Sequence, residues 1–415
     1  MRGVTVLLCS VGLVAACTTS KHTTDQSTTT LAPSATMQTD DQAKADAIMK
    51  IVNDYKNEAH LKAVIVRVTQ DGKNLVTAAT GESMTGVPAT VDMHFRNGAV
   101  AISYVSTLLL ELVDEHKLSL DDKLAKYLPN IPHADEVTLG QLAQMTSGYH
   151  DFVIGNQAFG EELLKNPYKA WTTDEQLSYA LDKPLWYPPG TNWDYAHTNY
   201  VLLGLVLSKV TGKSLADALQ EKVLGPLGLK NTKPNLTAEI PQPVLHAFSG
   251  ERRALFGSPP GLYEESTYWN PSWTLSQGAI ETSNIYDLEA SAVAVGTGKL
   301  LTPQSYKLMT SPDLRGKTTA IPGCVNCRPM TEAATYGLGV WISGDWLLQN
   351  PLFFGYAAVN AYLPKHKIGI AVAVTYEPEA FGPDGSYTNG GQSISSMIGA
   401  YLAPDDPPPT NSSHN

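Results

Sequence analysis

Residues 95–122 read FRNGAVAISYVSTLLLELVDEHKLSLDD, and this stretch decides the fold. From residue 99 to residue 115, apolar side chains occupy most faces of a helical projection. That pattern predicts a buried helix rather than an amphipathic surface helix. A helix buried on all sides needs neighbours on all sides, so we expect a large domain around it.

The segments on both sides of this helix predict an α+β fold. The expected elements are helices at 42–55, 200–210 and 393–402 and strands at 61–69, 75–79, 357–362 and 368–374. The first two strands are joined through a turn with Gly72, where a positive φ is favoured. Because the strands lie near both chain ends, we expect an antiparallel sheet built from both ends, with a large helical region between them.

Composition and charge describe a globular protein and argue against a nucleic-acid binder. Hydrophobic residues make up 43% of the 415 residues and charged residues 17%, which is enough apolar material for a core. Lys and Arg number 29 against 40 Asp and Glu, a net charge of -11, and no basic cluster stands out. Binding a phosphate backbone needs a basic surface, so we expect no nucleic-acid partner.

The N-terminus has the pattern of an export signal. Arg2 precedes an apolar stretch, Val4–Val14, that is too short to cross a bilayer, and Ala15-Ala16 leads to Cys17. Small residues before a cysteine resemble a bacterial lipobox, in which the cysteine is acylated. The alternative is an ordinary signal peptide that happens to end at a cysteine. We expect an exported lipoprotein of the bacterial cell envelope, anchored to the membrane through acylated Cys17.

Composition divides the chain into four expected parts. Residues 1–16 are a signal peptide and residues 17–40, rich in Thr and Ser, a lipid-anchored flexible tether. Residues 41–404 contain no second linker and no internal repeat, which indicates one domain. Residues 405–415 begin with Asp-Asp-Pro-Pro-Pro and are expected to be a disordered tail.

Two cysteines remain in the expected domain. Cys324 and Cys327 lie in a loop bracketed by Gly and Pro, and outside the cytoplasm such a pair favours a local disulfide. Free or redox-active thiols are the first alternative. A metal site is the second, but it would need two more ligands, which the nearby sequence does not offer. We expect no metal and no cofactor.

Short motifs in a fixed order carry a family resemblance. They are Phe95-Arg96 with Gly98, Lys117–Asp122, Tyr127-Leu128-Pro129, Thr146-Ser147-Gly148, Pro189-Gly190, Tyr195, Asn199-Tyr200, Tyr336–Gly339 and Ile368–Ile370. Together they resemble the serine β-lactamase and D-alanyl-D-alanine carboxypeptidase family, in the branch of class C β-lactamases, penicillin-binding proteins and related esterases. The resemblance covers about residues 41 to 403 and implies the β-lactamase/transpeptidase-like fold.

The chemistry that the resemblance implies depends on Ser-x-x-Lys at the start of the buried helix. The same register places Ala99 at the nucleophile position and Ile102 at the lysine position. A shifted register does not restore the pair, because no lysine occurs between Lys73 and Lys117. The acyl-enzyme chemistry of the family is therefore not expected.

The other two family motifs survive only in part. Tyr195 is kept, but His197 stands where the family has Asn, and both could face one cleft. A packed tyrosine and a solvated loop histidine are the plainer interpretation of this pair. The third motif, normally Lys- or His-x-Gly, aligns loosely with Gln349-Asn350-Pro351, and no Lys or His occurs from Tyr336 to Pro364. We expect Gln349 and Asn350 at the cleft.

Other hydroxyls offer no clear substitute nucleophile. Ser103 and Ser106 follow Ala99 on the same helix, where serine hydroxyls usually bond back to helix carbonyls. His150 is expected to be a surface-loop histidine. No Gly-x-Ser-x-Gly sequence, which would indicate a nucleophile elbow, occurs in the chain.

These observations predict a catalytically inactive relative of the serine hydrolases that acts by binding an envelope ligand or partner. The resemblance implies a peptidoglycan-like peptide, a β-lactam or a small ester as the ligand. The alternative function is a weak serine hydrolase, of esterase, β-lactamase or carboxypeptidase type, that uses a non-standard nucleophile.

Overall fold

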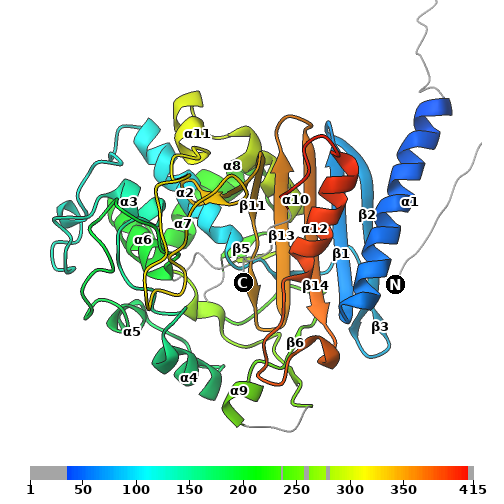
Figure 1. Ribbon diagram of the computed structural model, residues 1–415, viewed down its shortest axis with the longest axis horizontal. Coiled ribbons are helices and arrows are strands. Elements are labelled where there is room, and N and C mark those ends of the chain that lie inside the picture. The colour runs from blue at the N-terminus through cyan, green and yellow to red at the C-terminus, as the bar shows by residue number, and fades with distance from the viewer. Residues whose placement is uncertain (1–34, 235–236, 257–260, 277–280, 410–415) are drawn as a thin grey trace, which may run out of the picture. The chain divides into compact units, whose positions relative to one another are not determined.

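A nine-stranded sheet forms the centre of the fold and joins the two ends of the chain (Figure 1). The computed structural model describes residues 35–234, 237–256, 261–276 and 281–409. The strand order is β3-β2-β1-β14-β13-β11-β10-β9, with β12 paired to β13. The pairing of β1 with β14 brings strands from opposite ends of the sequence side by side, and it is antiparallel.

The strands of this sheet are β1 Leu61–Gln70, β2 Lys73–Met84, β3 Val87–Pro88, β9 Thr335–Tyr336, β10 Trp341–Ser343, β11 Trp346–Gln349, β12 Leu352–Phe353, β13 Tyr356–Leu363 and β14 Ile368–Tyr376. Two small sheets contain β4 Phe95–Arg96, β8 Glu281–Ser283 and β5 Lys233–Pro234, and β6 Phe248–Ser249 with β7 Glu264–Glu265. The expected α+β architecture is confirmed.

The helices are α1 Ala35–Glu58, α2 Val100–Asp114, α3 Leu139–Ala143, α4 Gln157–Lys165, α5 Thr173–Ser178, α6 His197–Thr211, α7 Leu215–Leu219, α8 Gly225–Leu227, α9 Arg253–Phe256, α10 Ile285–Thr297, α11 Pro303–Met309 and α12 Gly390–Leu402. Helix α2 is buried along nearly its whole length, as its all-round apolar pattern predicts. None of the helices in the described ranges is long and apolar enough to cross a membrane.

Alternation along the central strands separates two hydrophobic layers. On β1, Val64 and Val66 face a core completed by Ile394 and Ile398 of α12, whereas Ile65 faces the core that contains α2. Figure 1 shows α12 in front of β13 and β14 and the helical region beside the sheet. Helix α2 therefore occupies the centre of the larger core.

Two expected boundaries differ from the structure. Helix α1 begins at Ala35, so the last six residues of the expected 17–40 tether are helical. The expected disordered tail is ordered in its first part, because the Trp346 indole nitrogen donates to the Asp406 carbonyl at 3.0 Å. Prolines restrict the backbone here, and Pro408 packs near Gly399 of α12. The predicted signal peptide and Cys17 lie outside the described residues.

Candidate functional site

The nucleophile position of the first motif lies at the N-terminus of α2. Ala99 is the residue just before the helix, is partly exposed and makes no side-chain capping bond. Ile102, at the lysine position, is completely buried. A methyl group and a sec-butyl group cannot attack a carbonyl or accept a proton, so neither residue can supply the nucleophile or the base of the Ser-x-x-Lys motif.

The neighbouring hydroxyl groups are occupied by structural hydrogen bonds. Ser103 donates to the carbonyl of Val100 at 2.7 Å, and the Ser106 hydroxyl lies 2.7 Å from the phenol of Tyr200. Ser147 donates to the side-chain oxygen of Asn199 at 2.5 Å. The back-bonding expected for Ser103 is confirmed, and none of these serines has a basic partner in the described part of the chain.

The second motif forms a histidine–aspartate pair that the sequence did not reveal. His197 is the first residue of α6, and its Nδ1 lies 3.0 Å from Oδ2 of Asp151. The backbone N–H of His197 also donates to Asp151, and so do the backbone N–H groups of Val153 and Ile154. Four contacts therefore hold the carboxylate in place, and its side chain is 2% exposed.

This pair orients the imidazole as the carboxylate of a catalytic triad does. In a triad, however, the second ring nitrogen serves a nucleophilic hydroxyl. No serine or threonine hydroxyl in the described ranges hydrogen-bonds to His197. The pair can position a ligand or hold a proton.

Tyr195 is fixed among aromatic rings and stays a neutral phenol. Its ring lies parallel to that of Trp341 at 6.4 Å and makes an edge contact with the His197 ring at 5.4 Å. Burial, and then the negative charge of Asp151, raise the pKa of Tyr195 well above its ordinary range. A phenol held protonated in this way can donate a hydrogen bond but is a poor general base.

The third motif turns one polar side chain into the interior and the other toward α12. Gln349 is 1% exposed and donates to the carbonyl of Gly339 at 2.7 Å, so the expected position of its side chain at a cleft is corrected to the interior. Asn350 is partly exposed, and its amide donates to Gln392 of α12 at 2.8 Å, so the expected position of Asn350 at the cleft is corrected as well. Gln349 is the last residue of β11 and Asn350 follows it directly, so their successive side chains point in different directions.

Aromatic side chains connect the three motif segments. A Cβ on Gly98 would lie 2.7 Å from both Phe353 and Pro351, so the first and third motifs are in close contact and only glycine fits between them. Phe353 packs against Trp273 at 5.9 Å between ring centroids, and Trp273 lies 6.3 Å from the His197 ring. We call Ala99, Tyr195, His197, Trp273 and Phe353 the motif site.

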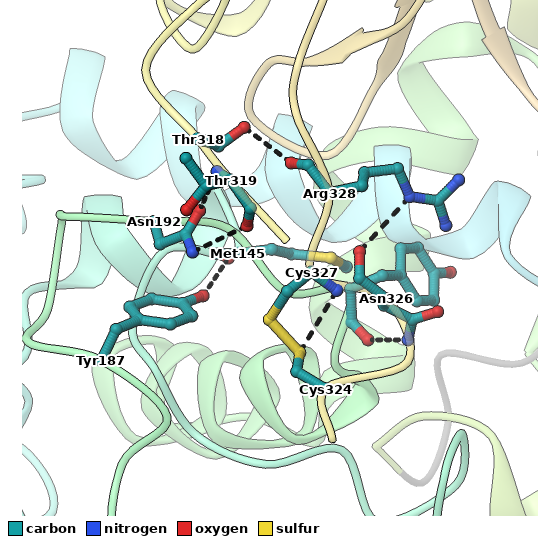
Figure 2. The surroundings of a disulfide bond; sticks show 10 residues. Met145, Tyr187, Asn192, Thr318, Thr319, Cys324, Asn326, Cys327 and Arg328 are labelled. Carbon is teal, nitrogen blue, oxygen red and sulfur yellow. Dashed lines mark hydrogen bonds between the residues drawn. A yellow bond between two sulfur atoms is a disulfide. The ribbon is translucent and has the colours of Figure 1, made fainter. Parts of the chain in front are cut away.

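A disulfide loop holds the Tyr195 segment from outside. Cys324 and Cys327 form a disulfide, as predicted (Figure 2). Within the same loop, the Asn326 amide donates to the carbonyl of Tyr195 at 2.9 Å. Asn192 lies three residues before Tyr195. Its side chain exchanges two hydrogen bonds of 3.0 Å with the backbone of Thr319.

Asp194 is buried beside this disulfide. Its carboxylate and the two sulfur atoms lie within 4.8 Å of one another, the spacing of a possible three-ligand metal site. Both sulfurs are bonded to each other, so they are not free to act as thiolate ligands. Burial, and then the charge of Asp151, raise the pKa of Asp194 to about 8. In this oxidised form the cluster is a structural contact.

His150 packs against Trp186, with ring centroids 4.1 Å apart. It is partly buried, and burial lowers its pKa. His150 lies in a loop, as expected, and its ring is stacked on Trp186 rather than free in solvent. Its ring contact is with Trp186 rather than with Tyr195 or His197, so we do not include it in the motif site.

Comparison with known proteins identifies the family. The family described as Beta-lactamase matches residues 45–389, most of the chain. The chain belongs to the β-lactamase family. This membership confirms the resemblance carried by the ordered motifs. The chain departs from the pattern of its family where Ala99 and Ile102 stand in place of the Ser-x-x-Lys pair.

Curated relatives of this β-lactamase-family chain include penicillin-binding and carboxypeptidase proteins. It is 35% identical over 182 residues to penicillin-binding protein 4 of Amycolatopsis lactamdurans, covering 42% of this chain and 45% of that protein. It is 29% identical over 173 residues to the D-alanyl-D-alanine-carboxypeptidase/endopeptidase AmpH of Escherichia coli K12, covering 40% and 43%. The chain thus spans less than half the length of these two relatives.

Among solved structures, the D-amino acid amidase of Ochrobactrum anthropi SV3 complexed with D-phenylalanine is similar with a TM-score of 0.72. It is 20% identical and covers 88% of this chain and 100% of that chain. At this identity the likeness shows the fold alone. It confirms the β-lactamase/transpeptidase-like fold.

Sequence reasoning missed three residues of the site. Asp151 lies 46 positions before its partner His197, and Trp273 comes from a segment with no family motif. Phe353 follows the third motif by two positions. A signal was present for Asp151, because it directly follows His150 and the Thr146-Ser147-Gly148 motif in a loop near the family site.

Proposed function

We propose that this member of the β-lactamase family binds a ligand at the motif site without forming an acyl-enzyme. The observation that carries the proposal is the paired replacement at α2, where Ala99 and Ile102 leave neither nucleophile nor base. A lysine left alone there would be a buried, unpaired charge, and replacing both groups removes that cost. Ala99, Tyr195 and His197 each keep exposed surface, so a ligand can reach them.

A peptide that ends in a D-amino acid is the proposed ligand class. Its support comes from relatives named as penicillin-binding and D-alanyl-D-alanine carboxypeptidase proteins. The Tyr195 phenol can donate to a carbonyl oxygen, and the largely buried rings of Trp273 and Phe353 make the surroundings of the site apolar. The weak-hydrolase alternative lacks support at the site, because Ser103 and Ser106 of α2 already hold structural hydrogen bonds.

Titration of the purified protein with N-acetyl-D-alanyl-D-alanine tests this proposal. We expect a saturable change in tryptophan fluorescence, because Trp273 and Trp341 lie against the site, and no change with the L,L peptide. Tyr195→Ala should weaken binding about tenfold, equivalent to about 1.4 kcal/mol. Tyr168→Ala is the control, since that tyrosine is 65% exposed. Equal binding of both peptides, or no response to either, would contradict the proposal.

We also propose that the protein is exported and held at the membrane of the cell envelope by acylated Cys17. The support is the sequence Val14-Ala15-Ala16-Cys17 after an apolar stretch. We expect Cys17→Ala to shift the protein from the detergent phase to the aqueous phase in phase partitioning, because one cysteine carries the lipid. Cys9→Ala, within the same signal, should have no effect. Unchanged partitioning of Cys17→Ala would place the anchor elsewhere.

A further inference from the structure

Arg96 is a buried arginine with no acidic partner. It lies on β4, is 2% exposed, and its Nη2 donates to the carbonyl of Ala238 at 2.5 Å. Its Nη1 is buried without a hydrogen-bond partner. The ionisable groups that act on it are the phenols of Tyr356 and Tyr268, and no described carboxylate pairs with it. Burial lowers the pKa of Arg96 to about 10, so it stays charged at neutral pH.

A pocket of about 430 Å³ lies next to residues that contact or pair with Arg96, although Arg96 itself is not among the residues that line it. Its lining includes Lys233, Thr237, Glu239, Ile240, Tyr268 and Thr282. Thr282 is the cross-strand partner of Arg96, and Ala238, whose carbonyl Arg96 holds, lies between two lining residues. The Thr282 hydroxyl is also buried without a partner. Ala99, Tyr195 and His197 do not line this pocket, so it is distinct from the motif site.

A buried charged group and a buried hydroxyl normally have hydrogen-bond partners. Two such groups without a partner, on neighbouring strands, suggest a ligand that supplies the missing hydrogen bonds. A guanidinium matches the planar, two-oxygen geometry of a carboxylate, and such charge-assisted hydrogen bonds are stronger than bonds to a neutral carbonyl. A ligand carboxylate could therefore take the place of the Ala238 carbonyl at Arg96. Lys233 adds a second positive charge at the pocket.

We propose that this pocket binds a small organic monocarboxylate, with its charged end at Arg96 and its apolar body on Ile240 and the flanking prolines. The volume suits a molecule the size of a single aromatic acid. Glu239 on the lining disfavours a more highly charged anion such as phosphate, because like charges repel across a small pocket. This site is independent of the proposed function at the motif site.

Thermal unfolding of the whole purified protein with phenylacetate tests the proposal. A ligand that binds only the folded state raises the midpoint temperature, so we expect a dose-dependent rise up to about 10 mM phenylacetate. Phenylacetamide, which has the same shape without the charge, and inorganic phosphate should give no rise. Arg96→Met should weaken phenylacetate binding roughly tenfold to hundredfold. Arg252→Met is the matched control, because Arg252 is paired with Glu264.

Two further variants keep the result interpretable. Should Arg96→Met not fold, Thr282→Val removes the second unsatisfied group at nearly constant volume and should also weaken binding. Tyr195→Ala should leave the rise unchanged, which separates this pocket from the motif site. The proposal is overturned by a rise that persists in a folded Arg96→Met protein, by an equal rise with phenylacetamide or phosphate, or by no rise with phenylacetate.

Discussion

The double variant Ala99→Ser with Ile102→Lys is expected to form a slow covalent adduct with a penicillin, whereas the parent protein forms none. Residues three apart lie on one face of a helix, so the two new groups would be neighbours at the start of α2. Tyr195 is already in place. Acylation should be slow, because His197 remains bonded to Asp151 and the third motif still lacks a cation.

The same double variant is expected to be less stable than the parent by about 1 to 4 kcal/mol. Ile102 is completely buried, so its replacement places an ammonium group in an apolar space with an imperfect partner. Ile102→Met is the matched control, since methionine has a similar length without the charge. Denaturant unfolding measures the difference, and equal stability of the lysine and methionine variants would contradict a buried position for this side chain.

Ala99→Ser alone should neither react nor gain much stability. Its hydroxyl would have no base, and Ala99 has helical dihedral angles of φ -61° and ψ -6° rather than the extended angles of a capping residue. Intact-protein mass spectrometry after incubation with a penicillin compares the three proteins. An adduct on the serine of the double variant alone supports the assigned register, whereas an adduct on the single variant would show that another base acts there.

Local pattern was sufficient to predict the framework. The all-round apolar stretch from residue 99 became α2, and the turn at Gly72 connects β1 and β2, with Gly72 at a φ of 77°. The expected helix at 200–210 begins three residues earlier, at His197, and ends at Thr211, where Gly212 caps it in the left-handed conformation. These features depend on neighbours in sequence, which is why periodicity and turn residues reveal them.

The contacts that shape the motif site depend on residues far apart in the chain. Trp273 reaches both His197 and Phe353, and neither contact leaves a periodic signal. Gln349 was expected at a cleft, but alternation on β11 and a bond to Gly339 place it inside. Loose alignment of a motif cannot decide which face a strand residue takes, because a shift of one position reverses it.

The edges of the domain were also harder to predict than its centre. Asp405 and Asp406 belong to a segment whose composition is typical of a disordered tail. The backbone carbonyl of Asp406 nevertheless accepts a hydrogen bond from the buried Trp346. The carboxylate of Asp405 lies 3.3 Å from the Nζ atom of Lys365, which is in the turn between β13 and β14. A single tertiary anchor can order a polar segment whose own sequence provides no core.

The central claim is that the parent protein lacks the acyl-enzyme chemistry of its family. In serine hydrolases, losing the nucleophile or its base lowers the rate by about 10⁶, equivalent to roughly 8 kcal/mol of transition-state stabilisation. Here Ala99 and Ile102 occupy the positions of both groups, and the hydroxyls of Ser103 and Ser106 on α2 hold structural hydrogen bonds. We therefore expect hydrolysis of nitrocefin and of short p-nitrophenyl esters to stay at background.

The most direct measurement combines turnover with intact-protein mass spectrometry on the stringently purified parent, after incubation with a penicillin and with a fluorophosphonate. The account predicts no mass increase with either probe and no turnover above buffer. A stoichiometric adduct on one serine, together with turnover that is lost when that serine is changed to alanine, would contradict it.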